Sequence, residues 1–325
     1  MAKKTRKSRR TKKNSAKLFF LFLIVLSAAL FLISYKDKIE GTAWQNQSVQ
    51  IDGNSSAEKD FNGDQPQSPA KQQLPQNNKQ TENKIITESK NLELPVCGHK
   101  NGNKNSESHE IHEHHGYSLC YREEYEQAEW VAYCFTRDEL VKNASRSNNF
   151  HADPSISTGS ATPEDYTKSG YDRGHLAPAA DLAWSEESMD DSFYMSNMSP
   201  QAPSFNRGIW KKLEEQTREW VEKFGTVYVV SGPVLEKTAE EYKAIGKNNV
   251  SVPEYYYKAL LASTEDGNFS AIGFILPNTK YTESFYNFAV SIDEVEKRTN
   301  LDFFSALPDN IENNIESKIP LNDWK

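Results

Sequence analysis

Residues Tyr171–Asp181 read YDRGHLAPAAD and place an arginine, a glycine and a histidine side by side, shortly before a proline. His175 belongs to the side-chain type that titrates near neutral pH, which suits proton transfer. Arg173 presents a planar set of donors that matches a phosphate in a two-point contact. Gly174 permits close approach of a ligand to the backbone. Taken alone, the segment fits a turn with a structural histidine as well as a catalytic centre.

A second polar segment, residues 197–214, reads NMSPQAPSFNRGIWKKLE. Apolar side chains then recur at helical spacing as far as Gly225, so the pattern predicts a helix over residues 206–225. Asn206 stands at its start, where Asn is a common cap, and Glu214 follows eight residues later. The cations of this helix could face phosphate or could form a solvated face that pairs with glutamates. They are Arg207, Lys211, Lys212, Arg218 and Lys223.

Aromatic and β-branched runs bounded by turn residues predict strands from Gly116 onward. These runs are EWVAYCF (129–135), TVYVVSGPVL (226–235), EYYYKALLAS (254–263) and FSAIGFILP (269–277). The segment SIDEVEKRTNL (291–301) predicts a further helix. Strands in runs with helices inserted between them indicate an α+β domain rather than a regular βαβ alternation.

The N-terminus combines a basic tip, residues 1–17, with an apolar run, residues 18–35. As a helix that rises about 1.5 Å per residue, the run would span roughly 27 Å, enough to cross the hydrocarbon core of a membrane. Because basic residues stay on the cytoplasmic side, we expect a transmembrane signal anchor with the remaining chain outside the cytoplasm, periplasmic or extracellular. A cleaved signal peptide is the alternative, and it would give a secreted protein.

Residues 36–115 are rich in Asn, Gln, Ser, Lys and Glu and show no sustained periodicity, which predicts a disordered polar linker. The folded domain is therefore expected over residues 116–325. The linker ends in four histidines that could bind a transition metal or could simply form a polar lead-in to the first strand. They are His109, His112, His114 and His115.

The chain has three cysteines, Cys97, Cys120 and Cys134. In an oxidising compartment Cys120 and Cys134 could form a disulfide if their segments are neighbouring strands. Two buried free thiols are an equally good alternative.

The charge balance disfavours a protein that coats nucleic acid passively. The formal net charge is −8, and without the nine basic residues of the tip 29 basic side chains face 46 acidic ones, a net −17. Attraction to phosphate needs local positive charge. The balance leaves room for an enzyme that holds phosphate with a few placed cations or a metal ion.

The two polar segments, in this order and at this separation, resemble the DNA/RNA non-specific endonuclease family, which includes secreted bacterial sugar-non-specific nucleases and mitochondrial endonuclease G. The resemblance covers roughly residues 116–310 and also includes SNMSPQ, VVSGP and IDEVEKRTNLDFFSALPD. It implies the α+β ββα-metal nuclease fold, an antiparallel sheet flanked by helices, here preceded by the membrane anchor and the linker.

The resemblance also implies roles for single residues. His175 matches the general base that activates water, and Asn206 matches the protein ligand of a hydrated Mg²⁺, for which Mn²⁺ or another divalent cation could substitute. Glu214 matches a carboxylate that acts on the metal through water. Eight residues of straight helix span roughly 12 Å, so Asn206 and Glu214 can serve one ion only if the helix starts late, bends or acts through water.

Four further residues complete the implied site. Arg173 would neutralise phosphate, and Asn197 matches an amide that supports the site. Arg146 is the candidate for an upstream arginine that stabilises the transition state. Asp172 is expected to fix the backbone of the motif rather than to bind metal.

The resemblance therefore predicts a membrane-anchored, metal-dependent endonuclease that hydrolyses phosphodiester bonds of DNA, RNA or both with little sequence specificity. The alternative is a non-catalytic nucleic-acid-binding or tethering surface protein that retains the nuclease fold. His175, Asn206 and Glu214 disfavour this alternative, because a binding module needs no group that activates water.

Overall fold

The computed structural model of the chain describes residues 91–97, 109–264 and 268–325. All of them lie in one compact unit, Gln73–Lys325. The expected basic tip and membrane anchor, residues 1–35, lie outside the described residues. Within the described residues no helix is both long enough and apolar enough to cross a membrane.

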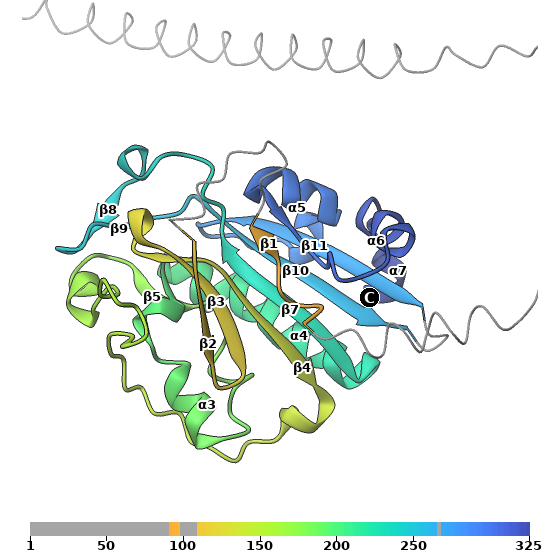
Figure 1. The fold of residues 1–325 in the computed structure, drawn as a ribbon, viewed down its shortest axis with the longest axis horizontal. Helices are drawn as coiled ribbons and strands as arrows, with labels where there is room; N and C mark the ends of the chain where they lie inside the picture. The colour runs from red at the N-terminus through yellow and green to blue at the C-terminus, as the bar shows by residue number, and fades with distance from the viewer. Residues whose placement is uncertain (1–90, 98–108, 265–267) are drawn as a thin grey trace, which may run out of the picture. The chain divides into compact units, whose positions relative to one another are not determined.

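A seven-stranded antiparallel sheet forms the centre of the fold, with the strand order β12-β11-β10-β7-β4-β3-β2 (Figure 1). The runs predicted as strands are confirmed as β4, β7, β10 and β11, which lie next to one another in the sheet. The seven strands are β2 (Glu110–His114), β3 (Tyr117–Arg122), β4 (Gln127–Thr136), β7 (Thr226–Pro233), β10 (Tyr255–Ser263), β11 (Phe269–Pro277) and β12 (Ala289–Val290).

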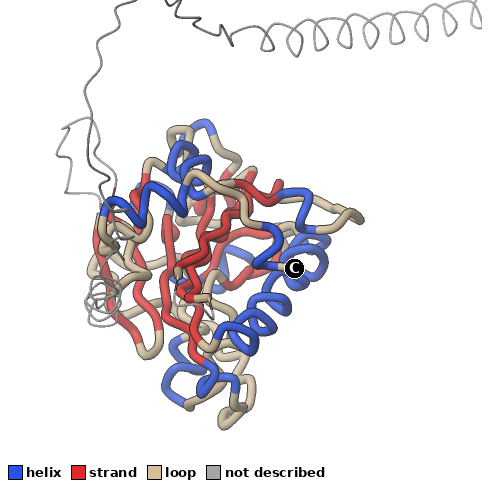
Figure 2. Tube along the Cα trace, turned by 90° about the vertical axis from the view of Figure 1, so that its right-hand side faces the viewer, coloured by secondary structure: helices blue, strands red, loops and turns tan. Residues whose placement is uncertain are grey.

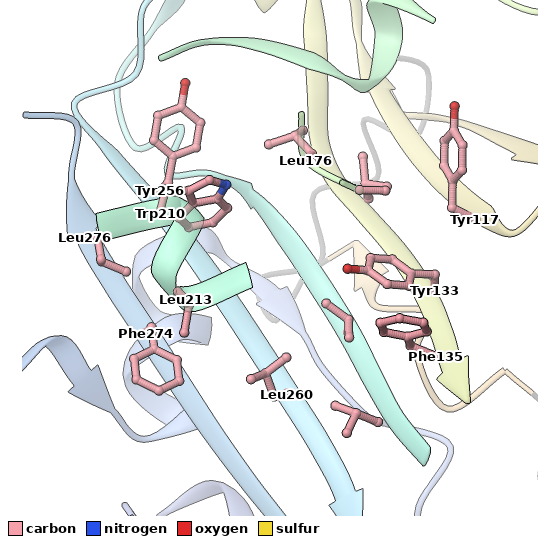
Figure 3. Close-up of a cluster of buried hydrophobic side chains, with 14 of the residues drawn as sticks. Tyr117, Tyr133, Phe135, Leu176, Trp210, Leu213, Tyr256, Leu260, Phe274 and Leu276 are labelled. Atoms are coloured by element: carbon pink, nitrogen blue, oxygen red, sulfur yellow. The ribbon is translucent and has the colours of Figure 1, made fainter. Parts of the chain in front are cut away.

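One face of the sheet packs against α4 (Lys211–Phe224). Side chains alternate between the two faces along each strand, so Tyr133 and Phe135 on β4 and Leu260 on β10 share this face. Figure 3 shows them in one buried cluster with Leu213 of α4. The helix is therefore held to the sheet by apolar burial along its length.

The other face packs against α5 (Ile292–Thr299) and α6 (Asp309–Glu316). Trp130, Val230 and Leu261 point to it, each one residue out of phase with a residue of the first face. In Figure 2, turned by 90° from Figure 1, helices lie beside the layer of strands. The predicted α+β class, an antiparallel sheet flanked by helices, is thus confirmed, and so is the helix predicted in residues 291–301.

The helix predicted from Asn206 begins later than expected. Residues Phe205–Trp210 form a wide helical turn that is interrupted at Gly208, and the regular helix α4 starts at Lys211. Its end agrees with the prediction, because Gly225 caps it with a φ of 89°, a conformation that favours glycine.

The sheet starts earlier than the expected domain boundary at residue 116. Residues 110–114, assigned to the linker, form the edge strand β2, and β1 (Val96–Cys97) pairs with β13 (Leu301–Asp302). Only His112 of β2 is buried, so the strand lacks the apolar alternation by which strands are recognised. The expectation of a linker up to residue 115 is wrong for this segment.

Of the cysteine side chains that the structure describes, Cys120 and Cys134 form no disulfide with each other. Their strands β3 and β4 are neighbours, as the disulfide alternative required, but Cys120 lies opposite Trp130 and Cys134 opposite Tyr228 of β7. The disulfide alternative is therefore wrong. Burial raises the pKa of the Cys134 thiol to about 12.

Candidate active site

The DRGH motif forms β5 (Asp172–His175), which pairs with β6 (Met198–Gln201) in a separate two-stranded antiparallel sheet that precedes α4 in the chain. Gly174 lies opposite Ser199, and a Cβ at Gly174 would come within 2.2 Å of the Gln201 side chain. Glycine is therefore needed here for close packing between the two strands.

A pocket of about 400 Å³ lies between β5, the loop that follows it and the start of α4. A second pocket of about 370 Å³ shares Arg173, Asn206 and Arg207 with the first and extends to Phe150. Five of the seven residues to which the resemblance assigns a role line the first pocket, and Asp172 lines the second. The five are Arg146, Arg173, His175, Asn206 and Glu214.

The late start of α4 removes the difficulty that Asn206 and Glu214 lie eight residues apart. Asn206 sits in the irregular turn and Glu214 in the first turn of the regular helix, and both line the pocket. The Asp172 carboxylate accepts a hydrogen bond from Asn206 Nδ2 at 3.0 Å. Among the described residues this is the only hydrogen bond of the Asn206 side chain, so its Oδ1 remains for a ligand.

Asp172 thus orients side chains, whereas we expected it to fix the backbone. Besides Asn206 it binds Arg207, whose Nε and Nη2 donate to its two carboxylate oxygens at 2.8 and 2.6 Å. A carboxylate held on both sides in this way fixes the rotation of the Asn206 amide.

His175 is seated against two aromatic rings. Phe150 and Phe193 meet it edge-on, with ring centroids 5.9 and 5.1 Å away. Removal from water lowers the pKa of His175 to about 3, and the positive charge of Arg146 adds to this effect. The imidazole is therefore neutral at pH 7, and among the described residues its Nε2 has no hydrogen-bond partner.

The same two rings carry arginines of the pocket. The Arg173 guanidinium carbon lies 4.7 Å from the Phe150 centroid, and that of Arg146 lies 4.9 Å from the Phe193 centroid. Such cation–π contacts use the face of a guanidinium group. At the edges only Arg146 Nε, which donates to Asn148, and Arg173 Nη2, which donates to the Pro163 carbonyl, are engaged within the described residues, so other N–H groups remain for an anion. Phe150 and Phe193 were missed because aromatic residues in a sequence indicate a core far more often than a site.

Arg218 is a further pocket residue that the resemblance did not single out. It lies one helical turn after Glu214, a spacing that places two side chains on the same face of a helix and could have indicated it. Its Nη1 donates to Asp181 Oδ1 at 2.6 Å, and the Tyr133 hydroxyl donates to Oδ2 at 2.8 Å. Asp181 is buried, so this pair holds Arg218 firmly at the pocket wall.

The buried side chain of Lys258 on β10 acts electrostatically on Glu214. Burial raises the pKa of Glu214, Lys258 acts in the opposite direction, and Asp181 raises it further. Lys258 is fully buried, with its Nζ 2.5 Å from Ser231 Oγ and 5.0 Å from the Trp210 ring centroid. Glu214 of the pocket therefore lies among buried acidic and basic groups whose effects on its pKa partly cancel.

Asn197 lies next to the pocket residues but does not line the pocket. It is fully buried, and its Nδ2 donates to the carbonyls of Ala177 and Ser192 at 2.9 Å each while its Oδ1 accepts from the Ala177 amide. All its polar atoms are thus used within the protein. Asn197 therefore holds the loop after His175 and does not contribute a group to the pocket, which agrees with a supporting rather than a catalytic role.

Only part of the predicted cationic face reaches the pocket. Arg207, Lys211 and Arg218 line it. Lys212 is exposed elsewhere, and Lys223 donates from its Nζ to the Asp323 carbonyl at 2.6 Å. The helix therefore presents a narrow row of three cations, and the solvated-face alternative holds for the others.

The four histidines at the start of the sheet do not converge. His112 Nε2 lies 3.5 Å from Glu110 Oε1, His114 Nε2 lies 3.0 Å from Asp153 Oδ2, and His115 Nδ1 lies 2.9 Å from Asp191 Oδ2. The alternative of one metal site built from the four histidines is therefore wrong. His109 has different neighbours, described below.

Known nucleases are similar to this chain in sequence and in fold. The sequence model of the family "DNA/RNA non-specific endonuclease" matches residues 98–310. Mitochondrial endonuclease G of Bos taurus is 36% identical over 198 residues, and mitochondrial nuclease EXOG of Danio rerio is 38% identical over 202 residues. Each alignment covers 58% of this chain, and they cover 66% and 59% of the relatives, slightly less than two thirds of their length.

A solved structure of an EndoG/EndoGI complex contains a similar fold. It superposes with a TM-score of 0.58 at 31% sequence identity, and covers 62% of this chain and 88% of that chain. The family match includes the central sheet, the β5–β6 pair, α4 and every residue of the pocket. The chain therefore belongs to the DNA/RNA non-specific endonuclease family.

Proposed function

We propose that this chain is a metal-dependent endonuclease that hydrolyses phosphodiester bonds of DNA, RNA or both with little sequence specificity. The observation that carries the proposal is the meeting of a neutral histidine, an amide, a carboxylate and four arginines in one pocket. Relatives that are named nucleases support it.

His175 is the proposed general base. A neutral imidazole with a free nitrogen can take the proton from a water molecule as the water attacks phosphorus. Phe150 and Phe193 restrict the ring and exclude bulk water from its edges. Both effects keep the base unprotonated and in place before substrate arrives.

Asn206 and Glu214 are the proposed metal-holding residues, Asn206 directly and Glu214 through an intervening water. A neutral amide oxygen and a carboxylate are suitable ligands for Mg²⁺ or Mn²⁺. Because Asn206 Nδ2 donates to Asp172, the amide oxygen Oδ1 of this pocket residue is the atom available as the metal ligand. When bound, the cation would act as a Lewis acid that stabilises charge on the phosphate and leaving oxygens.

Arg146, Arg173 and Arg218 are proposed to hold the phosphate and stabilise the charge that develops on it. Each is anchored from behind, by Phe193, Phe150 and Asp181 respectively. Contacts of this kind go to the nucleic-acid backbone and carry no base information, which explains low sequence specificity.

The test uses purified full-length chain on matched plasmid DNA and RNA, with Mg²⁺ or with EDTA. His175→Ala should lower cleavage by about 10²–10⁴-fold without changing the circular dichroism spectrum. His115→Ala is the matched control, since His115 is 67% exposed and lies outside the pocket. Unchanged cleavage by His175→Ala would overturn the proposal, and binding without cleavage would favour the non-catalytic alternative.

We further propose that residues 18–35 anchor the nuclease to a membrane, with residues 116–325 outside the cytoplasm. The basic tip followed by an uncharged apolar run supports this. Relatives named mitochondrial make an organelle-targeting role for the N-terminus the competing proposal. Full-length protein should stay with membranes in alkaline carbonate, and deletion of residues 1–35 should release it; release of the intact full-length chain contradicts the anchor.

A further inference from the structure

Three side chains with metal-ligating atoms meet on the side of the sheet away from α4. His109 Nδ1 lies 2.6 Å from Glu129 Oε1, Cys120 Sγ lies 3.1 Å from the same oxygen, and Cys120 Sγ lies 3.8 Å from His109 Nδ1. Cys120 is fully buried and packs in the cluster that includes α5, whereas α4 and the pocket are on the opposite face. The proposed nuclease mechanism uses none of the three.

An irregularity of the sheet creates this meeting point. Cys120 of β3 lies opposite Trp130 of β4, but the next residue, Tyr121, lies opposite Ala128. Glu129 is therefore an extra residue, a β-bulge, and bulges redirect side chains. The bulge places the Glu129 carboxylate beside Cys120.

The surroundings accommodate the bulge closely. The Glu129 carbonyl accepts a hydrogen bond from the Tyr257 hydroxyl at 3.0 Å. A Cβ at Gly232 would lie 2.1 Å from the same carbonyl oxygen, so only glycine fits there. The bulge is thus a fixed part of the fold, and the three ligand atoms are held before any ion binds.

The chemistry of the three groups is that of a zinc ligand set. Thiolate, imidazole and carboxylate bind Zn²⁺ at about 2.0–2.3 Å, and in a tetrahedral site such ligands lie about 3–4 Å from one another. The ligand atoms here lie 2.6, 3.1 and 3.8 Å from one another, so a small outward movement of the closest pair, His109 and Glu129, would give the spacing of such a site. Arg122 Nη1 binds the other Glu129 oxygen, Oε2, at 2.8 Å, and so orients the carboxylate with Oε1 toward the two remaining ligands.

A catalytic cysteine does not explain the arrangement. In a nucleophilic Cys–His–acid triad the imidazole relays a proton through its two different nitrogens. Here Cys120 and Glu129 both contact the same nitrogen, Nδ1 of His109, and the thiol is sealed from solvent. One ion bound between three side chains fits this geometry better than the proton relay of a catalytic triad does.

We propose that His109, Cys120 and Glu129 bind a transition-metal ion of the Zn²⁺ class, at a structural site separate from the nuclease pocket. Thiol and imidazole donors favour Zn²⁺ over Mg²⁺, whereas the amide and carboxylate of the pocket favour Mg²⁺. The ion would tie the residue before the edge strand β2 to β3 and β4. It displaces the thiol proton, so binding weakens as the pH falls.

The experiment separates this site from simple hydrogen bonding of a thiol and an imidazole to a carboxylate. Full-length chain carrying Asn206→Ala, which removes the proposed Mg²⁺ ligand, is titrated with Co²⁺ as a spectroscopic substitute for Zn²⁺. We expect a thiolate-to-cobalt charge-transfer band that saturates at one ion per chain and is abolished by excess Zn²⁺.

Cys120→Ser should remove the band and weaken cobalt binding at least about tenfold. Cys134→Ser is the matched control and should keep the band, because Cys134 is a half-buried free thiol on the same strand as Glu129. His109→Ala should weaken cobalt binding to a similar degree, while His115→Ala should not. This second pair of variants tests the site even if Cys120→Ser fails to fold. A band that survives Cys120→Ser, or binding indifferent to His109→Ala, would overturn the proposal, and nuclease activity has no part in the readout.

Discussion

At the scale of single residues, the side chains that line the first pocket are held in position by neighbouring residues that do not line it. Asp172 holds the Asn206 amide, Asp181 holds Arg218, and two phenylalanine rings hold His175. Each neighbour removes rotational freedom before substrate binds, which lowers the entropy cost of assembling the reacting groups.

The pKa of His175 gives a prediction about pH. A base must be neutral to act, and a pKa lowered from 6.5 to about 3 means that activity should persist well below pH 6.5. Arg146→Ala removes a positive charge that opposes protonation, so the pKa should rise and the acid limb of the kcat/KM profile should move to higher pH. The profile is measured on a short duplex at constant metal concentration.

Arg137→Ala is the control for that profile, because Arg137 is exposed and donates to the Glu222 carbonyl away from the pocket. An acid limb of Arg146→Ala that coincides with the wild-type limb, or that moves to lower pH, would show that Arg146 does not set the charge state of His175.

The sequence indicated the pocket residues well because their chemistry is concentrated in two short motifs. The supporting role of Asn197 came only from the resemblance, since an amide that binds metal and an amide that binds a loop look the same in a sequence. Phe150 and Phe193 carried no signal at all, because their contribution depends on a fold that brings together segments about forty residues apart. The type of a residue indicates what chemistry it can perform, whereas the residues that hold it in place can be identified only from the folded structure.

At the scale of elements, the strand pair β5–β6 carries the motif to the start of α4, and its packing depends on one glycine. Gly174→Ala would place a methyl group within 2.2 Å of the buried Gln201 side chain. We expect a loss of about 1–3 kcal/mol in unfolding free energy, as for other overpacked sites, together with reduced cleavage.

The double variant Gly174→Ala, Gln201→Ala tests the cause. It deletes the Gln201 atoms that the new methyl group would meet, so it should recover stability relative to the same chain with Gly174→Ala alone. Urea unfolding followed by circular dichroism measures both. If the second substitution only adds to the loss, the contact between these two residues is not the reason that position 174 is glycine.

Helices and strands could be predicted where their apolar residues follow a single regular spacing. The four apolar strands and α5 follow their patterns, and Gly225 marks the end of α4. β2 was assigned to the linker because only His112 of this edge strand is buried. The start of α4 was misplaced because apolar spacing continues through Ile209 and Trp210 although the backbone is irregular there.

At the scale of the whole molecule, the question is how an acidic protein holds a polyanion. Residues 116–325 carry 20 basic and 34 acidic side chains, a net −14. The cations that line the pocket are Arg146, Arg173, Arg207, Lys211 and Arg218. Nucleic acid must therefore be held by a few local contacts rather than by the overall charge.

This balance predicts a shallow salt dependence. With about four phosphates neutralised, the logarithm of the binding constant for duplex DNA should fall with a slope of about −4 against the logarithm of salt concentration. The measurement uses His175→Ala, which binds without cutting. A slope beyond about −7 would mean that the contact surface extends far past the pocket.

The bulge at Glu129 has a consequence for how the chain can change. Replacing Glu129 alters one side chain, but deleting it would remove the extra residue and slide Gln127 and Ala128 by one position against β3. Gln127 accepts a hydrogen bond from the Ser199 hydroxyl at 2.5 Å, and Ser199 lies opposite Gly174 of the DRGH motif. Deleting residue 129 would therefore disturb the DRGH strand and the nuclease pocket, whereas replacing Glu129 would affect only the proposed metal site.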